Sequence, residues 1–172
     1  MASLGPALCP FSHLREIDLD GGRLTGSLPH WLADCFPHLR ELDLSFNQLT
    51  GTIPSWVTQL AQGNIAQIKL ESNQLTGPIP LGLGYLPQLR VMWLARNNLE
   101  GMLPQDLAST KSLISLDTRY NSRLCGALPP GLHVERVPDG NWAGFCDKAY
   151  TEDSACAVLT FPGTGLGFPC AA

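Results

Sequence analysis

The side chains that could do chemistry here are six cysteines, four histidines and fifteen acidic residues, and they form no recognisable catalytic set. No two cysteines are spaced as C-x-x-C and the histidines belong to no ligand motif, so we expect no metal site. Carboxylates such as Asp18 and Asp43 recur along the chain, but no catalytic or metal-binding constellation of histidine or serine accompanies them. We therefore expect a protein that is not an enzyme and uses no cofactor.

Two further classes of ligand are not expected. Gly163, Gly165 and Gly167 alternate like part of a phosphate-binding loop, yet no strand precedes them and no lysine or helix follows. The 11 basic residues are dispersed and are outnumbered by 15 acidic ones, which gives a formal net charge of −4. Electrostatic binding to phosphates needs a basic stripe, so we expect no nucleic-acid partner.

The elements that position these side chains are set by an internal repeat. A motif of the form L-T-G-x-L/I-P, with variants, occurs five times at intervals of 24 to 26 residues. The copies begin at residues 24, 49, 75, 99 and 124. Such a period indicates one structural unit per repeat, and about three or more units must stack before a common core is buried.

Each motif follows an apolar frame of the form L-x-x-L-x-L-x-x-N-x-L. In the second repeat the frame consists of Leu39, Leu42, Leu44, Asn47 and Leu49. Side chains alternate along a strand, so Leu42 and Leu44 should face the core while Asp43 and Ser45 face solvent. An apolar residue three places after each proline indicates a short helical turn on the opposite side of the coil.

This frame with its T-G-x-I-P extension, as in Thr50, Gly51, Ile53 and Pro54, resembles the plant-type leucine-rich repeat family over about residues 14–132. The resemblance implies an α/β-type solenoid, a right-handed superhelix of five repeats with a short parallel β-sheet on its concave side. It also implies a receptor-like, non-catalytic binding module. Because the repeat is used with many partners, the resemblance says little about the ligand.

The asparagine of the frame has a structural interpretation. It is expected to turn inward and bond the backbone of adjoining loops, where its loss would leave buried groups unpaired at about 1–3 kcal/mol each. Terminal repeats of a solenoid are usually atypical, which accounts for Gly22 in the asparagine position of the first repeat and Thr118 in place of a leucine in the last. The predicted ladder is Asn47, Asn73, Asn97 and Asn121.

The ends of the chain depart from the repeat. We expect residues 1–13 to form a truncated or divergent N-terminal cap, 14–132 to form five repeats, and 133–172 to form an irregular C-terminal cap or tail rich in Gly, Pro and Cys. Cys125 lies in an N-S-R-L-C-G context that resembles the start of the disulfide-bonded cap in plant receptor ectodomains.

The resemblance favours pairing Cys125 with Cys146 and Cys156 with Cys170, although four cysteines allow three connectivities. We expect Cys35 to be a buried free thiol and Cys9 to lack a partner.

The outward positions of the predicted strands have no structural role assigned and are the expected binding surface. Their amino-terminal half is acidic, whereas the other half holds aromatic and arginine side chains, the types that dominate binding energy at interfaces. The predicted ligand-binding residues are Asp18, Asp43, Phe46, Lys69, Glu71, Trp93, Arg96, Asp117, Arg119 and Tyr120.

Trp93 is the most informative of these residues, because a large aromatic is not needed on the solvent side of a strand. Two interpretations stay open: it contacts a ligand, or it packs on Lys69 or Asp117. For the acidic residues, a solvated face that aids solubility is the alternative to ligand contact.

The size of this face limits its partner. Five strands of about four exposed residues give a patch of roughly 300 Å², whereas a standard protein interface needs about 800 Å² from each partner. We therefore expect a protein or short peptide ligand that is extended, that also grips the loops, or that is shared with a second repeat protein. The alternatives are an inhibitor of a secreted polysaccharide-degrading enzyme and an intracellular scaffold.

The sequence gives conflicting indications of compartment. It has no apolar run of about 20 residues that would cross a bilayer, and its first residues do not read as a signal peptide. Plant-type repeats with cysteine-bearing ends usually belong to secreted or cell-surface proteins. We therefore expect an extracellular or cell-surface location as a fragment of a longer protein, with a cytoplasmic chain as the alternative.

Overall fold

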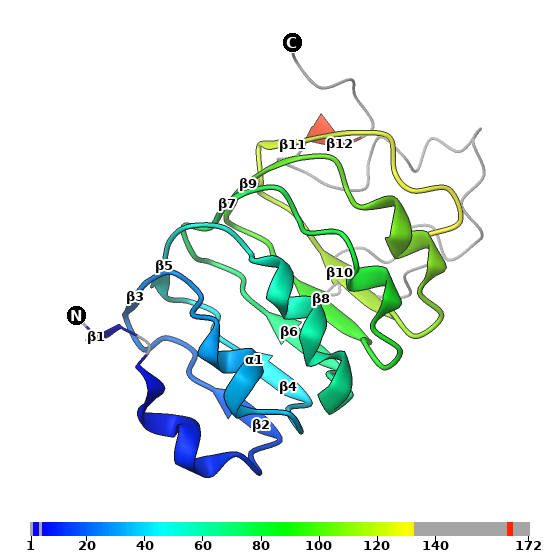
Figure 1. Cartoon of the computed structure of the whole chain (residues 1–172). Coiled ribbons are helices and arrows are strands. Elements are labelled where there is room, and N and C mark those ends of the chain that lie inside the picture. The colour runs from blue at the N-terminus through cyan, green and yellow to red at the C-terminus, as the bar shows by residue number, and fades with distance from the viewer. Residues whose placement is uncertain (1, 4, 133–164, 167–172) are drawn as a thin grey trace.

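A computed structural model describes residues 2–3, 5–132 and 165–166 of the chain. The coils stack side by side into a solenoid, with a parallel sheet along one side and short helical turns along the other (Figure 1). The main sheet has the order β10-β8-β6-β4-β2, so every neighbour in space is the equivalent strand of the next repeat. Its strands are β2 (Glu16–Asp18), β4 (Glu41–Asp43), β6 (Gln67–Lys69), β8 (Val91–Trp93) and β10 (Ser115–Asp117). The expected solenoid with a short parallel sheet is confirmed.

Two smaller parallel sheets run along another edge of the coils. The first has the order β1-β3-β5 and the second has the order β12-β11-β9-β7. Their strands are β1 (Ala2–Ser3), β3 (Leu24–Gly26), β5 (Gln48–Leu49), β7 (Thr76–Gly77), β9 (Asn98–Gly101), β11 (Arg123–Gly126) and β12 (Gly165–Leu166). Strand β12 pairs with β11 at Cys125 and Gly126, so two residues of the C-terminal segment extend the last coil.

The turns opposite the main sheet are one α-helix and three 3₁₀ helices, and a fourth 3₁₀ helix precedes the first coil. They are η1 (Pro6–Phe11), α1 (Trp31–Cys35), η2 (Ser55–Gly63), η3 (Leu83–Tyr85) and η4 (Gln105–Ser109). Each of the last four begins within three residues of the repeat proline, whose fixed φ suits the start of a helical turn. The apolar residue expected three places after each proline is buried at Leu32, Val57, Leu83, Leu107 and Leu132.

The core is a stack of leucine and isoleucine layers shared by consecutive coils. Leu42 and Leu44 are 1% and 0% exposed, and Ile68 and Leu70 occupy the same places in the next coil at 2% and 1%. Replacing one such leucine by alanine costs about 2–5 kcal/mol, because the neighbouring layers cannot close the cavity. No coil buries its leucines alone, which is why the repeats must fold together.

The frame asparagines bond backbone groups of two coils at once. Asn97 accepts a hydrogen bond from the Leu75 N–H at 2.9 Å and donates to the Leu70 carbonyl at 2.9 Å, both in the preceding coil. It also donates to the carbonyls of Leu94 and Ala95 in its own coil. Asn47, Asn73 and Asn121 make the equivalent bonds.

Each asparagine bonds backbone groups of the coil before its own. The first coil has no preceding coil, so an asparagine there would have no such groups to bond. Asn47 accepts from the Leu24 N–H and donates to the Leu19 carbonyl, so the first coil is already supplied by the second. Gly22, which holds the asparagine position of the first repeat, would place a Cβ 3.4 Å from Asn47 Oδ1. At the other end, Thr118 replaces a frame leucine and is fully buried, and its Oγ1 has no hydrogen-bond partner among the residues that the structure describes.

A buried aspartate joins the third and fourth repeats on the helical side. Asp106 Oδ2 accepts hydrogen bonds from the backbone N–H groups of Gly82, at 3.0 Å, and Gly84, at 2.8 Å. A Cβ at Gly84 would collide with the backbone carbonyl of Asp106. The glycine is therefore required by the close approach of η3 to η4.

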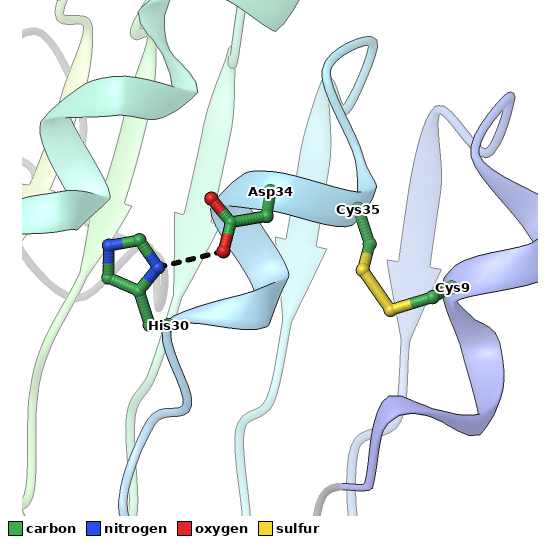
Figure 2. Close-up of a disulfide and its surroundings, with 4 residues drawn as sticks. All are labelled: Cys9, His30, Asp34 and Cys35. Atoms are coloured by element: carbon green, nitrogen blue, oxygen red, sulfur yellow. Dashed lines mark hydrogen bonds and ion pairs between the residues drawn. A yellow bond between two sulfur atoms is a disulfide. The ribbon is translucent and has the colours of Figure 1, made fainter.

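The first coil is covered by the segment that contains η1, and a disulfide fixes it there. Cys9 of η1 is bonded to Cys35 at the end of α1, with Cα atoms 5.0 Å apart (Figure 2). Leu8 packs against the edge of the core. The expectations of a free thiol at Cys35 and no partner for Cys9 are wrong, because a separation of 26 residues in sequence hides that η1 and α1 are neighbours.

Cys125 is also disulfide-bonded. Cys146, Cys156 and Cys170 lie outside the described residues, as do the segment 133–164 and the residues 167–172. The proposed connectivity of the C-terminal cysteines therefore stays a prediction.

Candidate binding face

The outward side chains of the main sheet stand in rows, because the five strands pair in register. One row runs through Asp18, Asp43, Lys69, Trp93 and Asp117. We call the outward side of strands β2, β4, β6, β8 and β10, together with the residues that follow each strand, the concave face. Asp43, Lys69, Trp93 and Asp117, which were predicted to share a surface, are consecutive neighbours on it.

Lys69 lies at the centre of the acidic half of the face and joins two repeats. Its Nζ is 2.6 Å from Glu41 Oε1 and 3.4 Å from Asp43 Oδ2. Burial alone would lower the pKa of Lys69, but the hydrogen bond and charge of Glu41, together with Asp43, raise it above 10.5. The lysine is therefore protonated at neutral pH, and its charge is balanced within the protein.

Trp93 is held by its neighbours on both sides. Lys69 Nζ lies 5.4 Å from the centroid of the indole ring, within the range of a cation–π contact. On the other side, Trp93 Nε1 donates a hydrogen bond to Ser115 Oγ at 3.0 Å. Of the two packing partners considered for Trp93, the structure therefore shows contact with Lys69. The indole remains partly exposed between the two halves of the face.

Three of the predicted ligand-binding aspartates also have a local role. Asp18, Asp43 and Asp117 occupy the last position of their strands, and Oδ1 of each accepts a hydrogen bond from the backbone N–H two residues later. An aspartate suits this turn because its short side chain reaches back to its own backbone. Their recurrence along the chain therefore has a conformational cause.

The outward residues of the last coil differ from the expectation of free solvent exposure. Asp117 is 2% exposed and Arg119 is 7% exposed. Arg119 donates to Asp117 Oδ1 from Nε at 2.8 Å and to Oδ2 from Nη2 at 2.5 Å. This two-point bond neutralises both groups, so neither offers an unpaired charge to a partner. Ser45 and Ala95 are also buried, because short side chains lie below their longer neighbours.

The residue just before each asparagine has a left-handed backbone. Phe46, Ser72, Arg96 and Tyr120 have φ values of +54°, +55°, +55° and +58°, and Gly21 has the same conformation in the first coil. The left-handed region costs a residue other than glycine about 1–2 kcal/mol. Backbone bonds hold it in place, since the Phe46 N–H donates to the Glu71 carbonyl and the Arg96 N–H donates to the Arg119 carbonyl.

The side chains at these turns form an exposed rim beside the sheet. Phe46 and Tyr120 are 57% and 47% exposed. The guanidinium carbon of Arg96 lies 4.5 Å from the centroid of the Tyr120 ring. Two aromatic side chains and an arginine are thus held at fixed positions without contributing to the core.

A pocket of about 240 Å³ opens between the rim and the sheet. Its walls are formed by the rim side chains and by charged or small side chains at or just after the ends of the strands. The lining residues are Phe46, Glu71, Ser72, Ala95, Arg96, Asp117, Arg119 and Tyr120. The volume is below the usual range of about 300–1,000 Å³ for small-molecule sites, so it suits a single side chain.

Glu71 is the one acidic residue lining this pocket whose side chain has no hydrogen bond or ion pair within the described part of the chain. Burial raises the pKa of Glu71 above 4.5, and the charges of Asp117 and Asp43 raise it further. Arg119 and Lys69 act in the opposite direction but more weakly. The two aspartates therefore outweigh the two cations in their effect on the pKa of this carboxylate.

The structure gathers six predicted residues around the pocket and separates others from it. Phe46, Glu71, Arg96, Asp117, Arg119 and Tyr120 line it together. Asp18 lies exposed at the far edge of the sheet on β2. Ser72 and Ala95 were not selected from the sequence, although their positions in the repeat match those of Phe46 and Arg119 and could have indicated them.

The described residues offer little for metal chemistry or membrane insertion. Within residues 2–3, 5–132 and 165–166, no group of three or more His, Cys, Asp or Glu side chains is placed to hold a metal ion. In the same part of the chain, no helix has the length and apolar character needed to cross a membrane.

Comparison with known proteins finds a repeat family in part of the chain. The Leucine Rich Repeat family profile matches residues 13–35 and 38–60. No curated protein sequence matches the chain. Among solved structures, the chain is similar to the leucine-rich repeat ectodomain of the Arabidopsis thaliana membrane receptor kinase GASSHO1/SCHENGEN3, in complex with CASPARIAN STRIP INTEGRITY FACTOR 2. That match has 27% identity and a TM-score of 0.66, and it covers 76% of this chain and 15% of that one.

Two other similar structures differ in size. A plant ice-binding protein matches with 30% identity and a TM-score of 0.68, over 76% of this chain and 40% of that chain. The complex of BIR3 and SERK2 from Arabidopsis thaliana matches with 28% identity and a TM-score of 0.66, over 91% of this chain and 73% of that chain. The chain thus spans less than half the length of the receptor kinase ectodomain and of the ice-binding protein.

Proposed function

Because this chain belongs to the plant-type leucine-rich repeat family, we propose that it is a non-catalytic module that binds a protein or a short peptide on its concave face. The observation that carries this proposal is the exposed rim of Phe46, Arg96 and Tyr120 beside a pocket for one side chain. Bulky residues occupy left-handed positions there at a conformational cost, and none of the three belongs to the hydrophobic core. Aromatic and arginine side chains of this kind commonly dominate binding energy.

Similar proteins support the same class of function. The GASSHO1/SCHENGEN3 ectodomain was solved in complex with CASPARIAN STRIP INTEGRITY FACTOR 2, and BIR3 was solved in complex with SERK2. We infer that this chain acts in the same general way as part of a receptor-like protein. In this proposal, residues 14–132 carry the binding face, residues 1–13 cover one end of it, and residues 133–172 form the other cap or tail.

The proposed location is extracellular or at the cell surface. The bond between Cys9 and Cys35 and the bonded state of Cys125 support it, because disulfides persist in oxidising compartments. The same bonds argue against an intracellular scaffold, since cytosolic thiols are kept reduced.

The test is capture of partners from a secreted-protein extract on the immobilised full chain. Tyr120→Ala removes a rim side chain, and Tyr85→Ala removes an exposed tyrosine, 72% exposed, from η3 on the helical side. Loss of more than 1 kcal/mol of binding energy would lower the affinity for the captured partner at least about fivefold in the Tyr120 variant. The Tyr85 variant should bind as the wild type does. Equal loss in both variants, or loss only at Tyr85, would overturn the assignment of the face.

A further inference from the structure

We propose that the pocket beside Glu71 binds a cationic side chain, lysine or arginine, of an extended peptide segment. This inference rests on the proposed function, because it names the ligand chemistry of the same face. It is carried by the pairing of charges around the pocket, by the aromatic rim, and by the volume enclosed.

The acidic groups near the pocket are already paired, with one exception. Lys69 is paired with Glu41 and Asp43. Arg119 is bonded at two points to Asp117, and Arg96 is stacked on Tyr120. The carboxylate of Glu71 lines the pocket and makes no hydrogen bond or ion pair among the described residues.

An ionised carboxylate can only accept hydrogen bonds, so the complementary ligand group is a donor. The local potential further favours a donor with a positive charge. Asp117 and Asp43 each raise the pKa of Glu71 more strongly than Arg119 or Lys69 lowers it, so these four charges together give a negative field at the carboxylate. An ammonium or guanidinium group would relieve that field, whereas a second carboxylate would strengthen it.

The rim and the volume fit the same ligand. Aromatic faces attract cations, and Arg96 over the Tyr120 ring is an example already present in the protein. Phe46, at the other end of the rim, has no ring contact or cation among the described residues and is 57% exposed. The pocket of about 240 Å³ admits the stem of one long side chain, but it is small for a folded ligand.

Each probe is a pentapeptide with blocked termini, in which four glycines flank one central test residue. Binding is followed by the amide chemical shifts of the isotope-labelled full chain. Central lysine or arginine should shift amides near residues 71–72, 95–96 and 119–120 in a saturable manner, whereas central norleucine should not. The Glu71→Gln variant should weaken the affinity for the cationic probe by about threefold to tenfold. Glu16→Gln, which removes an exposed acid on β2 of the same face, is the matched control and should leave the affinity unchanged.

Two results would overturn the inference, and a third would separate it from the proposed function. If a peptide with a central glutamate shifted the pocket amides and the lysine and arginine peptides did not, the pocket would bind an anionic side chain and not a cationic one. No saturable shift with any probe would remove the pocket as a side-chain site. If Tyr120→Ala still abolished capture of a partner in either case, the concave face would remain the binding surface and only the cationic ligand would be rejected.

Discussion

Trp93 Nε1 donates a hydrogen bond to Ser115 Oγ at 3.0 Å across neighbouring strands of the main sheet. Ser115 is 6% exposed, so this bond is partly removed from water. Trp93→Phe keeps an aromatic ring beside Lys69 but removes the donor. We expect it to lower the free energy of unfolding by about 0.5–1.5 kcal/mol, the usual net worth of one hydrogen bond.

Chemical denaturation of a double-mutant cycle tests this relationship. Ser115→Ala should lower the free energy of unfolding by a similar amount, and the double variant should lose less than the sum of the two single changes. Strictly additive losses would mean that the two side chains do not interact.

A second prediction concerns the asparagine ladder. Asn97→Ala leaves the Leu75 N–H without its partner inside the core, at about 1–3 kcal/mol for the buried group. It also removes the bond from Asn97 to the Leu70 carbonyl, to which Asn73 still donates. The adjacent Asn98 is exposed, so Asn98→Ala should change the free energy of unfolding by less than about 0.5 kcal/mol. Thermal or urea unfolding of the two variants side by side gives the comparison. Similar losses in both would contradict a ladder that joins the coils.

The disulfide of the first coil gives a third prediction. Replacing Cys9 and Cys35 together by serine opens a loop of 26 residues, which should lower the free energy of unfolding by about 3–4 kcal/mol. The double variant is preferred to chemical reduction because Cys125 is also bonded. Peptide mapping of the unreduced wild type should recover Cys9 linked to Cys35. Recovery of Cys9 with another cysteine, or as a free thiol, would refute the link.

The titration of Glu71 gives a prediction about pH. Burial raises the pKa of Glu71, and Asp117 and Asp43 raise it further, so the folded chain holds this proton more tightly than the unfolded chain does. Ionisation of Glu71 therefore reduces stability as the pH rises from about 4.5 through the raised pKa. Glu71→Gln cannot ionise, and it should be more stable than the wild type near pH 7. The difference should disappear below about pH 4, where both side chains are neutral.

Denaturation curves of the wild type and Glu71→Gln at the two pH values provide the measurement. A variant that is less stable than the wild type at neutral pH would indicate that Glu71 has a favourable partner. That outcome would contradict the proposal that the Glu71 carboxylate is available to bind a ligand.

The repeat period was enough to predict the solenoid, the strands and the rows of outward residues. Leucines recur at fixed intervals because each coil must supply the same layer of a common core, so their pattern can be read without coordinates. The pairing of Cys9 with Cys35 could not be read in this way. It depends on where an irregular segment packs, and no repeating pattern governs that segment.

The outward residues of the concave face were predicted in outline, but their pairings were not. Alternation along the strands identified which residues point outward. It could not indicate that Asp117 and Arg119 neutralise each other while Glu71 has no such partner in the described part of the chain. Those differences arise from side-chain length and depth on a curved sheet. The aspartates at the strand ends were selected for their charge, although the turn that follows each strand explains their recurrence equally well.

Photo-crosslinking from two matched phenylalanine positions is the most direct test of the concave face as the binding surface. A benzoyl-phenylalanine replaces Phe46, which is 57% exposed on the rim, or Phe11, which is 59% exposed on η1. Irradiation in the presence of the captured partner should give a covalent adduct from position 46 and none from position 11. An adduct only from position 11, or none from position 46 while the partner stays bound, would contradict recognition on this face.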